Sequence, residues 1–210
     1  MGRAIAQVQP DCAEVTLVVD DEHGGSQPSF FGLGGEQRFR AEVTAVAAGA
    51  DATGRWLKAL RPLLRALVDD DAAWLGRFDA VSGRYLPLLE DGDVEPLRQL
   101  FASDVAAADI QQLRFRRPGW PMLGHKILPQ LGELRGWSTH LAPAGFHDGL
   151  GVGLLTEDRR RVGYLTLLTY RPEAAPAVAA ALLHAVNPLI ADAVDRVSPH
   201  GGAGTTSRGT

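Results

Sequence analysis

The sequence is poor in cysteine and has no excess of positive charge. Cys12 is the only cysteine among the 210 residues, so an intramolecular disulfide is impossible, and so is a zinc site built from several cysteines. The formal net charge of −4 provides no overall attraction to phosphate backbones or anionic lipids. These two scarcities favour a protein of the reducing cytoplasm that does not bind nucleic acid.

Long apolar runs and catalytic motifs are also missing. No stretch approaches the roughly 20 apolar residues of a membrane-spanning helix, and the first residues lack the apolar core of a secretory signal. There is no GxSxG motif, and the glycine-rich segment 24–37 matches neither GxGxxG nor GxxxxGK[ST]. We therefore expect a cytoplasmic protein that is not an enzyme and has no membrane anchor.

What the sequence does contain is a strand pattern in the region 137–170. Leu150, Val152 and Leu154 alternate with glycines, a polar turn follows at 156–160, and the chain returns with a second alternating segment at 162–168. The segment 72–89 predicts another hairpin, in which Trp74 and Phe78 share one face of the first strand. The chain is therefore expected to contain antiparallel strands.

Helices are predicted on both sides of these hairpins. Apolar residues recur at three- and four-residue spacing over 55–68, 94–117 and 174–197. Pro62 and Pro188 fall inside the first and last of these segments, where each predicts a local bend. Residues 13–20 suggest a strand, whereas residues 39–48 fit either a strand or a helix.

The segment LAPAGFHDGLGVGLLTEDRRRVGYLTL, residues 141–167, resembles the late part of GAF-type sensory domains. The domains in question precede LuxR-type helix-turn-helix modules in actinobacterial transcriptional regulators. As an order of elements, the resemblance covers residues 55–197. It implies an α/β (α+β) fold with a GAF-like central antiparallel sheet, flanking helices and an N-terminal extension. The expected divisions are an extension or arm at 1–50, a GAF-like sensory domain at 51–197 and a flexible polar tail at 198–210.

The resemblance implies a regulatory domain that senses an unidentified small molecule and signals through its flanking helices. The helices at 55–70 and 174–197 would also form a homodimer, and a further protein partner is conceivable. No basic recognition helix follows residue 197, so we expect no direct DNA binding by this chain, which is either a free-standing sensor or part of a longer product. The alternative is a ligand-free GAF-like dimerisation or docking module, and a weaker alternative is a haem-based redox or gas sensor. The sequence identifies no cofactor.

The resemblance also suggests, by position, which residues line a ligand pocket. Small-molecule sites are mostly apolar with a few polar groups, although each aromatic side chain could equally belong to the ordinary core. The candidates are Trp74, Phe78, Phe115, Trp120, Trp137, His140, Phe146, Leu150 and Tyr164.

Two polar clusters allow competing interpretations. The arginines of segment 114–117 could clamp a phosphate or carboxylate, or they could form the solvated end of a helix, which is the interpretation we favour. His140 and His147, the latter beside Asp148, could bind a metal. Their spacing across a turn matches no known ligand motif, and neither does the acidic cluster at 20–23, so we expect no metal site.

Overall fold

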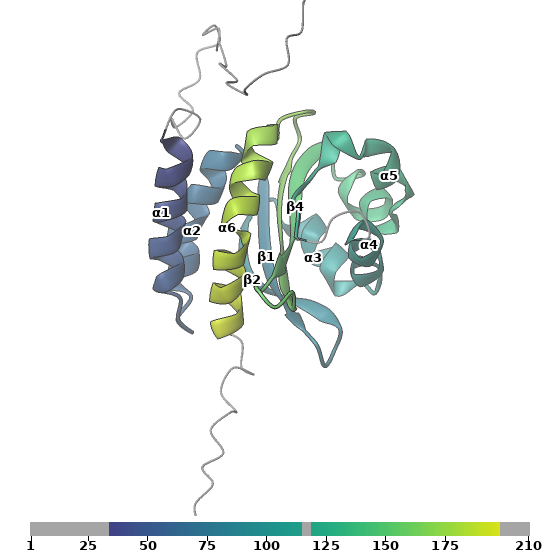
Figure 1. Ribbon diagram of the computed structural model, residues 1–210. Coiled ribbons are helices and arrows are strands. Elements are labelled where there is room, and N and C mark those ends of the chain that lie inside the picture. Colours follow the sequence, from purple (N-terminus) through teal and green to yellow (C-terminus); the bar gives the residue numbers. More distant parts are fainter. Residues whose placement is uncertain (1–33, 115–118, 198–210) are drawn as a thin grey trace, which may run out of the picture.

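The computed structural model describes residues 34–114 and 119–197. Within these ranges a five-stranded sheet, antiparallel throughout, lies between two groups of helices (Figure 1). The spatial order of the strands is β2-β1-β5-β4-β3. Their bounds are β1 (Ala72–Asp79), β2 (Arg84–Gly92), β3 (Met122–Leu123), β4 (Asp148–Leu155) and β5 (Arg161–Thr169). The predicted fold class, a central antiparallel sheet with flanking helices, is confirmed.

One face of the sheet is covered by α1 (Gly35–Ala48), α2 (Arg55–Leu67) and α6 (Ala177–Arg196) (Figure 1). Leu183 and Ile190 of α6 are fully buried, because their spacing places them on the helix side that faces the sheet. Both α2 and α6 continue through their internal prolines. By length and composition alone α6 could cross a membrane, but packing in this core accounts for its apolar side.

Residues 39–48, whose sequence fits either a strand or a helix, belong to helix α1. It packs against both α2 and α6, and its residues Phe39 and Val43 belong to the same buried core as those helices. The division proposed at residue 50 stays a prediction, but the core extends to the N-terminal side of it. The predicted strand at 13–20 and the tail at 198–210 lie outside the described residues.

The opposite face of the sheet carries shorter helices. They are α3 (Glu95–Ala102), α4 (Val105–Arg114), the 3-10 helix η1 (Gly124–Lys126), α5 (Leu128–Glu133) and the π-helix η2 (Trp137–Leu141). The segment 94–117, predicted to be mostly helical, forms α3 and α4, which are separated at Ser103, whose hydroxyl donates to the carbonyl of Leu100 at 2.6 Å.

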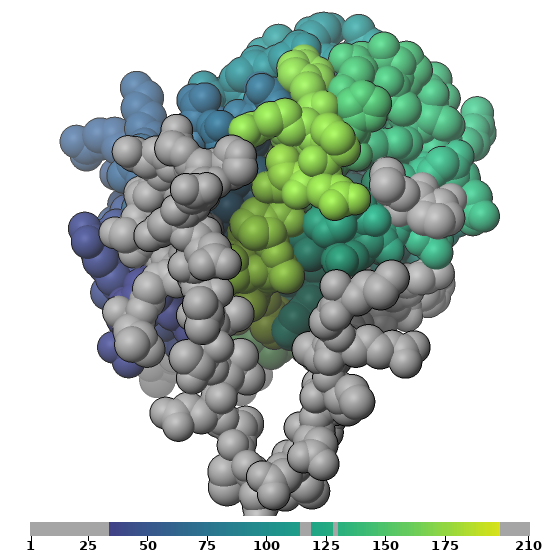
Figure 2. Space-filling model, turned by 90° about the horizontal axis from the view of Figure 1, so that it is seen from above, coloured from purple at the N-terminus to yellow at the C-terminus, as the bar shows by residue number. Residues whose placement is uncertain are grey.

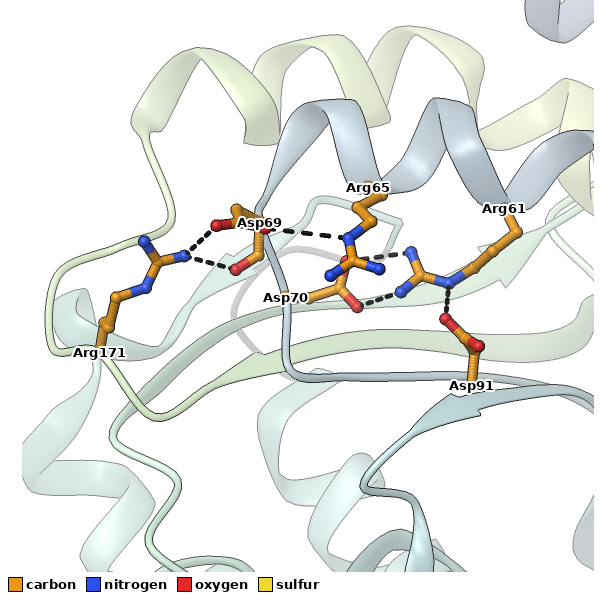
Figure 3. A network of polar contacts seen from close by, with 6 residues as sticks. All are labelled: Arg61, Arg65, Asp69, Asp70, Asp91 and Arg171. Atoms are coloured by element: carbon orange, nitrogen blue, oxygen red, sulfur yellow. Dashed lines mark hydrogen bonds and ion pairs between the residues drawn. The ribbon is translucent and has the colours of Figure 1, made fainter. Parts of the chain in front are cut away.

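A polar network fastens α2 to the edge of the sheet (Figure 3). The guanidinium of Arg61 donates to both carboxylate oxygens of Asp70, at 3.1 and 2.7 Å, and its Nε donates to Asp91 at 2.6 Å. The carboxylate of Asp70 has no exposed surface. Arg61 therefore joins α2, the segment before β1 and the end of β2.

Candidate functional site

A cavity of about 80 Å³ lies between the sheet and the short helices of the second face, and it is partly open to solvent. A buried water needs only about 10–15 Å³ of such space, while an apolar cavity of about 150 Å³ binds benzene. The cavity is therefore large enough for part of a small organic molecule. Apolar side chains form most of its wall: Leu97, Leu100, Phe101, Ile110, Leu113, Leu131, Leu134 and Leu141.

Strand β4 forms the floor of the cavity because its glycines occupy the cavity side. The alternating leucines and valine of this strand belong to the core under α1, α2 and α6, so the residues between them face the other way. Gly149 and Gly151 border the cavity, and a Cβ placed on Gly151 would lie 2.5 Å from the hydroxyl oxygen of Tyr164. The glycines that alternate in β4 therefore leave room on this face for the side chains of Leu168 and Tyr164, which lie over Gly149 and Gly151.

Two hydroxyl groups from β5 lie at the floor. Tyr164 and Thr166 both border the cavity, and only 8% of the surface of Tyr164 is exposed. Burial, together with the nearby Tyr85, raises the pKa of Tyr164 above its ordinary range. Within ranges 34–114 and 119–197, neither hydroxyl has a hydrogen-bond partner. The oxygen of neither hydroxyl is fully buried, so both are accessible to a ligand group that could pair with them.

Asp109 of α4 supplies a carboxylate to the cavity wall. Its Oδ2 accepts a hydrogen bond from the backbone N–H of Gly136 at 2.6 Å, which holds α4 against the start of η2. Burial raises the pKa of Asp109, although the N–H bond from Gly136 opposes that effect. Among the residues whose side chains the structure describes, none that lines the cavity is lysine, arginine or histidine.

Asp148 links the cavity wall to the segment that leads into α6. Its side chain is fully buried. It accepts hydrogen bonds from the backbone N–H of His125 at 2.8 Å and of Ala175 at 3.0 Å, and it contacts Nδ1 of His125 at 3.0 Å. Burial alone would raise the pKa of Asp148, but these hydrogen bonds hold it below its ordinary value. His125 follows the cavity-lining Gly124, so Asp148 joins this part of the wall to Ala175.

The cavity brings together three of the nine residues suggested by the sequence. Trp137, Leu150 and Tyr164 all border it. Trp137 belongs to η2, which closes one side, and Tyr164 lies on the floor. Leu150 also belongs to the core under the helices of the opposite face. That these three residues contact a ligand stays a prediction.

Three further candidates lie on the same face of the sheet but not at the cavity. Trp74 stacks on Phe101, with 3.6 Å between ring centroids, and Phe146 stacks on Tyr170 at 4.7 Å. Phe78 lies beneath a guanidinium group, that of Arg161, whose central carbon is 3.6 Å from the ring centroid. These aromatic rings fill the second core beside the cavity.

The remaining candidates lie further from the cavity or outside the described ranges. Trp120 is 40% exposed and packs against His184, with 4.1 Å between their ring centroids. His140 is half-buried and does not border the cavity. Phe115 and the arginines at 116 and 117 are not among the described residues. Within those that are described, no group of three histidine, cysteine or acidic side chains is placed to hold a metal ion.

Sequence reasoning missed most of the cavity wall. The apolar stripes of 94–117 indicated helices, but they did not indicate which surface those helices cover. Asp109 and Thr166 have no motif around them, so only the three-dimensional arrangement shows their role. The signal that could have located the floor is the alternation that includes Gly149 and Gly151, because glycines on one side of a strand allow other groups to approach its backbone closely.

Comparisons with known proteins give limited information. No family model matches the chain, and no curated protein is significantly similar to it in sequence. Among solved structures it is similar to the crystal structure of PelD 158-CT from Pseudomonas aeruginosa PAO1, with a TM-score of 0.48 and 16% sequence identity. The match covers 76% of this chain and 51% of that chain, so it spans about half of the length of the PelD chain. We therefore base the functional proposal on the cavity itself.

Proposed function

We propose that this chain is a GAF-like sensory domain that binds a small molecule and passes the bound state to its helices. The observation that carries the proposal is the cavity above the glycine floor of β4, with the unpaired hydroxyl of Tyr164 at its base. A concave apolar site with a few polar groups is the usual form of a small-molecule site. The flanking helices would carry the signal, and the sensing role would belong to transcriptional or signalling control.

The proposed signal runs from the cavity wall to the helices on the other face of the sheet. Gly124 and Ile127 border the cavity, and the intervening His125 is bound by Asp148, which also binds Ala175 ahead of α6. Figure 2 shows the segment that leads into α6 at the boundary between the α1–α2 side and the cavity-side helices. A ligand that favours one position of η1 would shift the population of α6 positions by its difference in affinity for the two states.

The site supports binding better than catalysis. Its ionisable side chains are Asp109 and Tyr164. An activated nucleophile requires an adjacent general base, and the cavity lining presents no such pair. We therefore propose a domain without enzymatic activity of its own.

Two rival functions are weaker. A docking module without a ligand would be expected to fill this space with side chains, whereas a cavity of about 80 Å³ is present. A haem sensor would use one of the histidines as an axial ligand, but none of the histidines that the structure describes borders the cavity. The features of the site therefore favour a small organic ligand over both alternatives.

A homodimer through α2 and α6 remains a proposal. Leu183 and Ile190 of α6 are buried inside the chain, so a dimer would have to use the outward side of that helix. Val178, which is 43% exposed, lies on that side. If α6 forms the interface, Val178→Glu should reduce the mass measured by light scattering to that of a single chain, while Ala181→Ser should not. An unchanged mass with Val178→Glu would contradict this interface.

Native mass spectrometry of the purified chain tests the proposed function. The mass under native conditions should exceed an integral number of chains, and the excess should disappear under denaturing conditions. Such a difference would also begin to identify the ligand by its mass. If the native mass equals the sum of the chains, and adding candidate small molecules produces no bound species, the docking module becomes the better account.

A further inference from the structure

We infer that the cavity takes a compact, uncharged and largely apolar molecule whose single polar group, of the hydroxyl type, pairs with the hydroxyl of Tyr164. This inference rests on the proposed function, because it specifies the class of ligand for the same site. It depends on three properties of the cavity: its size, the charge of its wall and the position of its unpaired polar groups.

The size of the cavity sets the first limit. Its volume of about 80 Å³ is smaller than the cavity of about 150 Å³ that accommodates benzene in another protein. A ligand with one ring would fill the space and extend to the open side. Most of the wall is leucine, isoleucine and phenylalanine, so the buried part of the ligand must be apolar. A nucleotide or a large polar metabolite does not fit these conditions.

The charge of the wall argues against an anion. The part of the lining that the structure describes has no basic side chain, and it contains the carboxylate of Asp109. An anionic ligand would lose its hydration without gaining a counter-charge, which costs several kcal/mol in an apolar site. A cationic ligand would be stabilised less by Asp109 than by a carboxylate with both oxygens free, because Oδ2 of Asp109 already accepts the N–H of Gly136. An uncharged ligand avoids both costs.

The polar groups at the floor give the ligand its one anchor. A tyrosine hydroxyl both donates and accepts hydrogen bonds, and that of Tyr164 lies above Gly151, inside the space that the glycine leaves free. Thr166 lies two residues along β5 on the same face and also borders the cavity. A hydroxyl on the ligand could pair with Tyr164 while its apolar part contacts the leucines of α3 and α5.

The test uses the full chain and four probes of one-ring size: phenol, toluene, benzoate and benzylammonium. Binding is followed by NMR through the amide signals of Gly149 and Gly151, which line the floor. Phenol should bind about five- to tenfold more tightly than toluene, because a neutral hydrogen bond is worth about 1 kcal/mol. Benzoate and benzylammonium should bind at least about tenfold more weakly than phenol.

Tyr164→Phe is the decisive variant. It should remove the advantage of phenol over toluene and leave the affinity for toluene within about twofold, because only the hydrogen bond is lost. Tyr170→Phe is the matched control, because its hydroxyl is bound by Asp93 away from the cavity. The control should keep the preference for phenol. Melting curves of both variants establish that they are folded.

The outcomes separate the ligand class from the function. If benzoate or benzylammonium binds as tightly as phenol, or if Tyr164→Phe keeps the preference for phenol, the class is wrong while a small-molecule site remains. If no probe shifts the amide signals but a native mass excess is present, the class is again wrong. If no probe binds and the native mass shows no excess, the proposed function fails as well.

Discussion

The hydroxyl of Tyr164 lies above Gly151, where a Cβ would come within 2.5 Å of it. In the register of the sheet Tyr164 is paired with Gly153 and Gly151 is paired with Thr166. The ring of Tyr164 therefore leans along β4 from its own partner toward the next glycine on the same face. One tyrosine and one glycine, on neighbouring strands, thus define the floor of the cavity.

Asp148→Asn should destabilise the protein and alter its response to pH. The two oxygens of the carboxylate each accept one backbone N–H, whereas an amide has only one oxygen, so one N–H would face the NH₂ group and we expect a loss of about 2–4 kcal/mol at pH 7. The pKa of Asp148 is lowered in the folded state. Its contribution is therefore complete above the unfolded pKa of about 3.9 and is lost as the pH falls through the lower folded value.

Urea unfolding of the wild type and of Asp148→Asn from pH 7 to pH 2 measures this contribution. The difference between the two proteins should shrink only at the acid end of the series. Asp192→Asn is the control, because Asp192 is exposed on α6 and should change the free energy of unfolding by less than about 0.5 kcal/mol. A constant difference at every pH would show that the charge of Asp148 does not contribute.

Arg61→Ala should cost more stability than Arg65→Ala on the same helix. Arg61 is paired with the buried Asp70, whereas Arg65 and its partner Asp69 are mostly exposed, with 3.8 Å between their charged atoms (Figure 3). Removing the partner of a buried charge costs about 3–5 kcal/mol. An exposed pair contributes about 0–1 kcal/mol. Thermal and urea unfolding at pH 7 would measure both changes.

The same variant should become relatively more stable in acid. Burial already raises the pKa of Asp70, and Arg61 opposes this effect. Without Arg61 the folded pKa should rise further, so the folded state binds a proton more readily than the unfolded chain does. Stability is then greatest below the unfolded pKa and falls as the pH rises through the folded pKa. Equal losses for Arg61→Ala at pH 5 and pH 8 would contradict this account.

Phe39→Ala tests whether α1 belongs to the folded core. Phe39 is fully buried with the residues of α2 and α6, and removing a buried phenylalanine side chain costs about 3–5 kcal/mol. Arg40→Ala, which changes the next and exposed residue of the helix, should cost less than about 0.5 kcal/mol. If Phe39→Ala unfolds at the same urea concentration as the wild type, α1 is an arm that contributes nothing to the core.

The sequence predicted the strands and long helices well because their patterns depend on local burial. The alternation of Leu150, Val152 and Leu154 predicted β4, and the spacing of Leu183 and Ile190 predicted α6. Helix α1 was less clear, because Phe39, Val43 and Ala47 are its only buried residues apart from the first glycine. So few apolar positions give a weak periodicity.

The cavity was only partly predictable. Whether a buried aromatic residue fills a core or lines a cavity depends on its neighbours across the sheet, as Trp74 and Tyr164 show. Both are on the same face, but Trp74 is covered by Phe101, while Tyr164 lies over Gly151 and borders the cavity. Trp120 differs from both of these residues, because its side chain is partly exposed. Such differences depend on contacts between residues far apart in the sequence.

The most direct test of the cavity as the ligand site is the affinity of phenol for Gly151→Ala and Gly153→Ala. The methyl group added at residue 151 would meet the hydroxyl of Tyr164, whereas one added at residue 153 would have no atom within 4 Å. We predict that Gly151→Ala weakens phenol binding at least about tenfold, because the displaced ring of Tyr164 would occupy cavity space and move its hydroxyl, while Gly153→Ala stays within about twofold of the wild type. Equal phenol affinities for the two folded variants would contradict the assignment of the cavity as the ligand site.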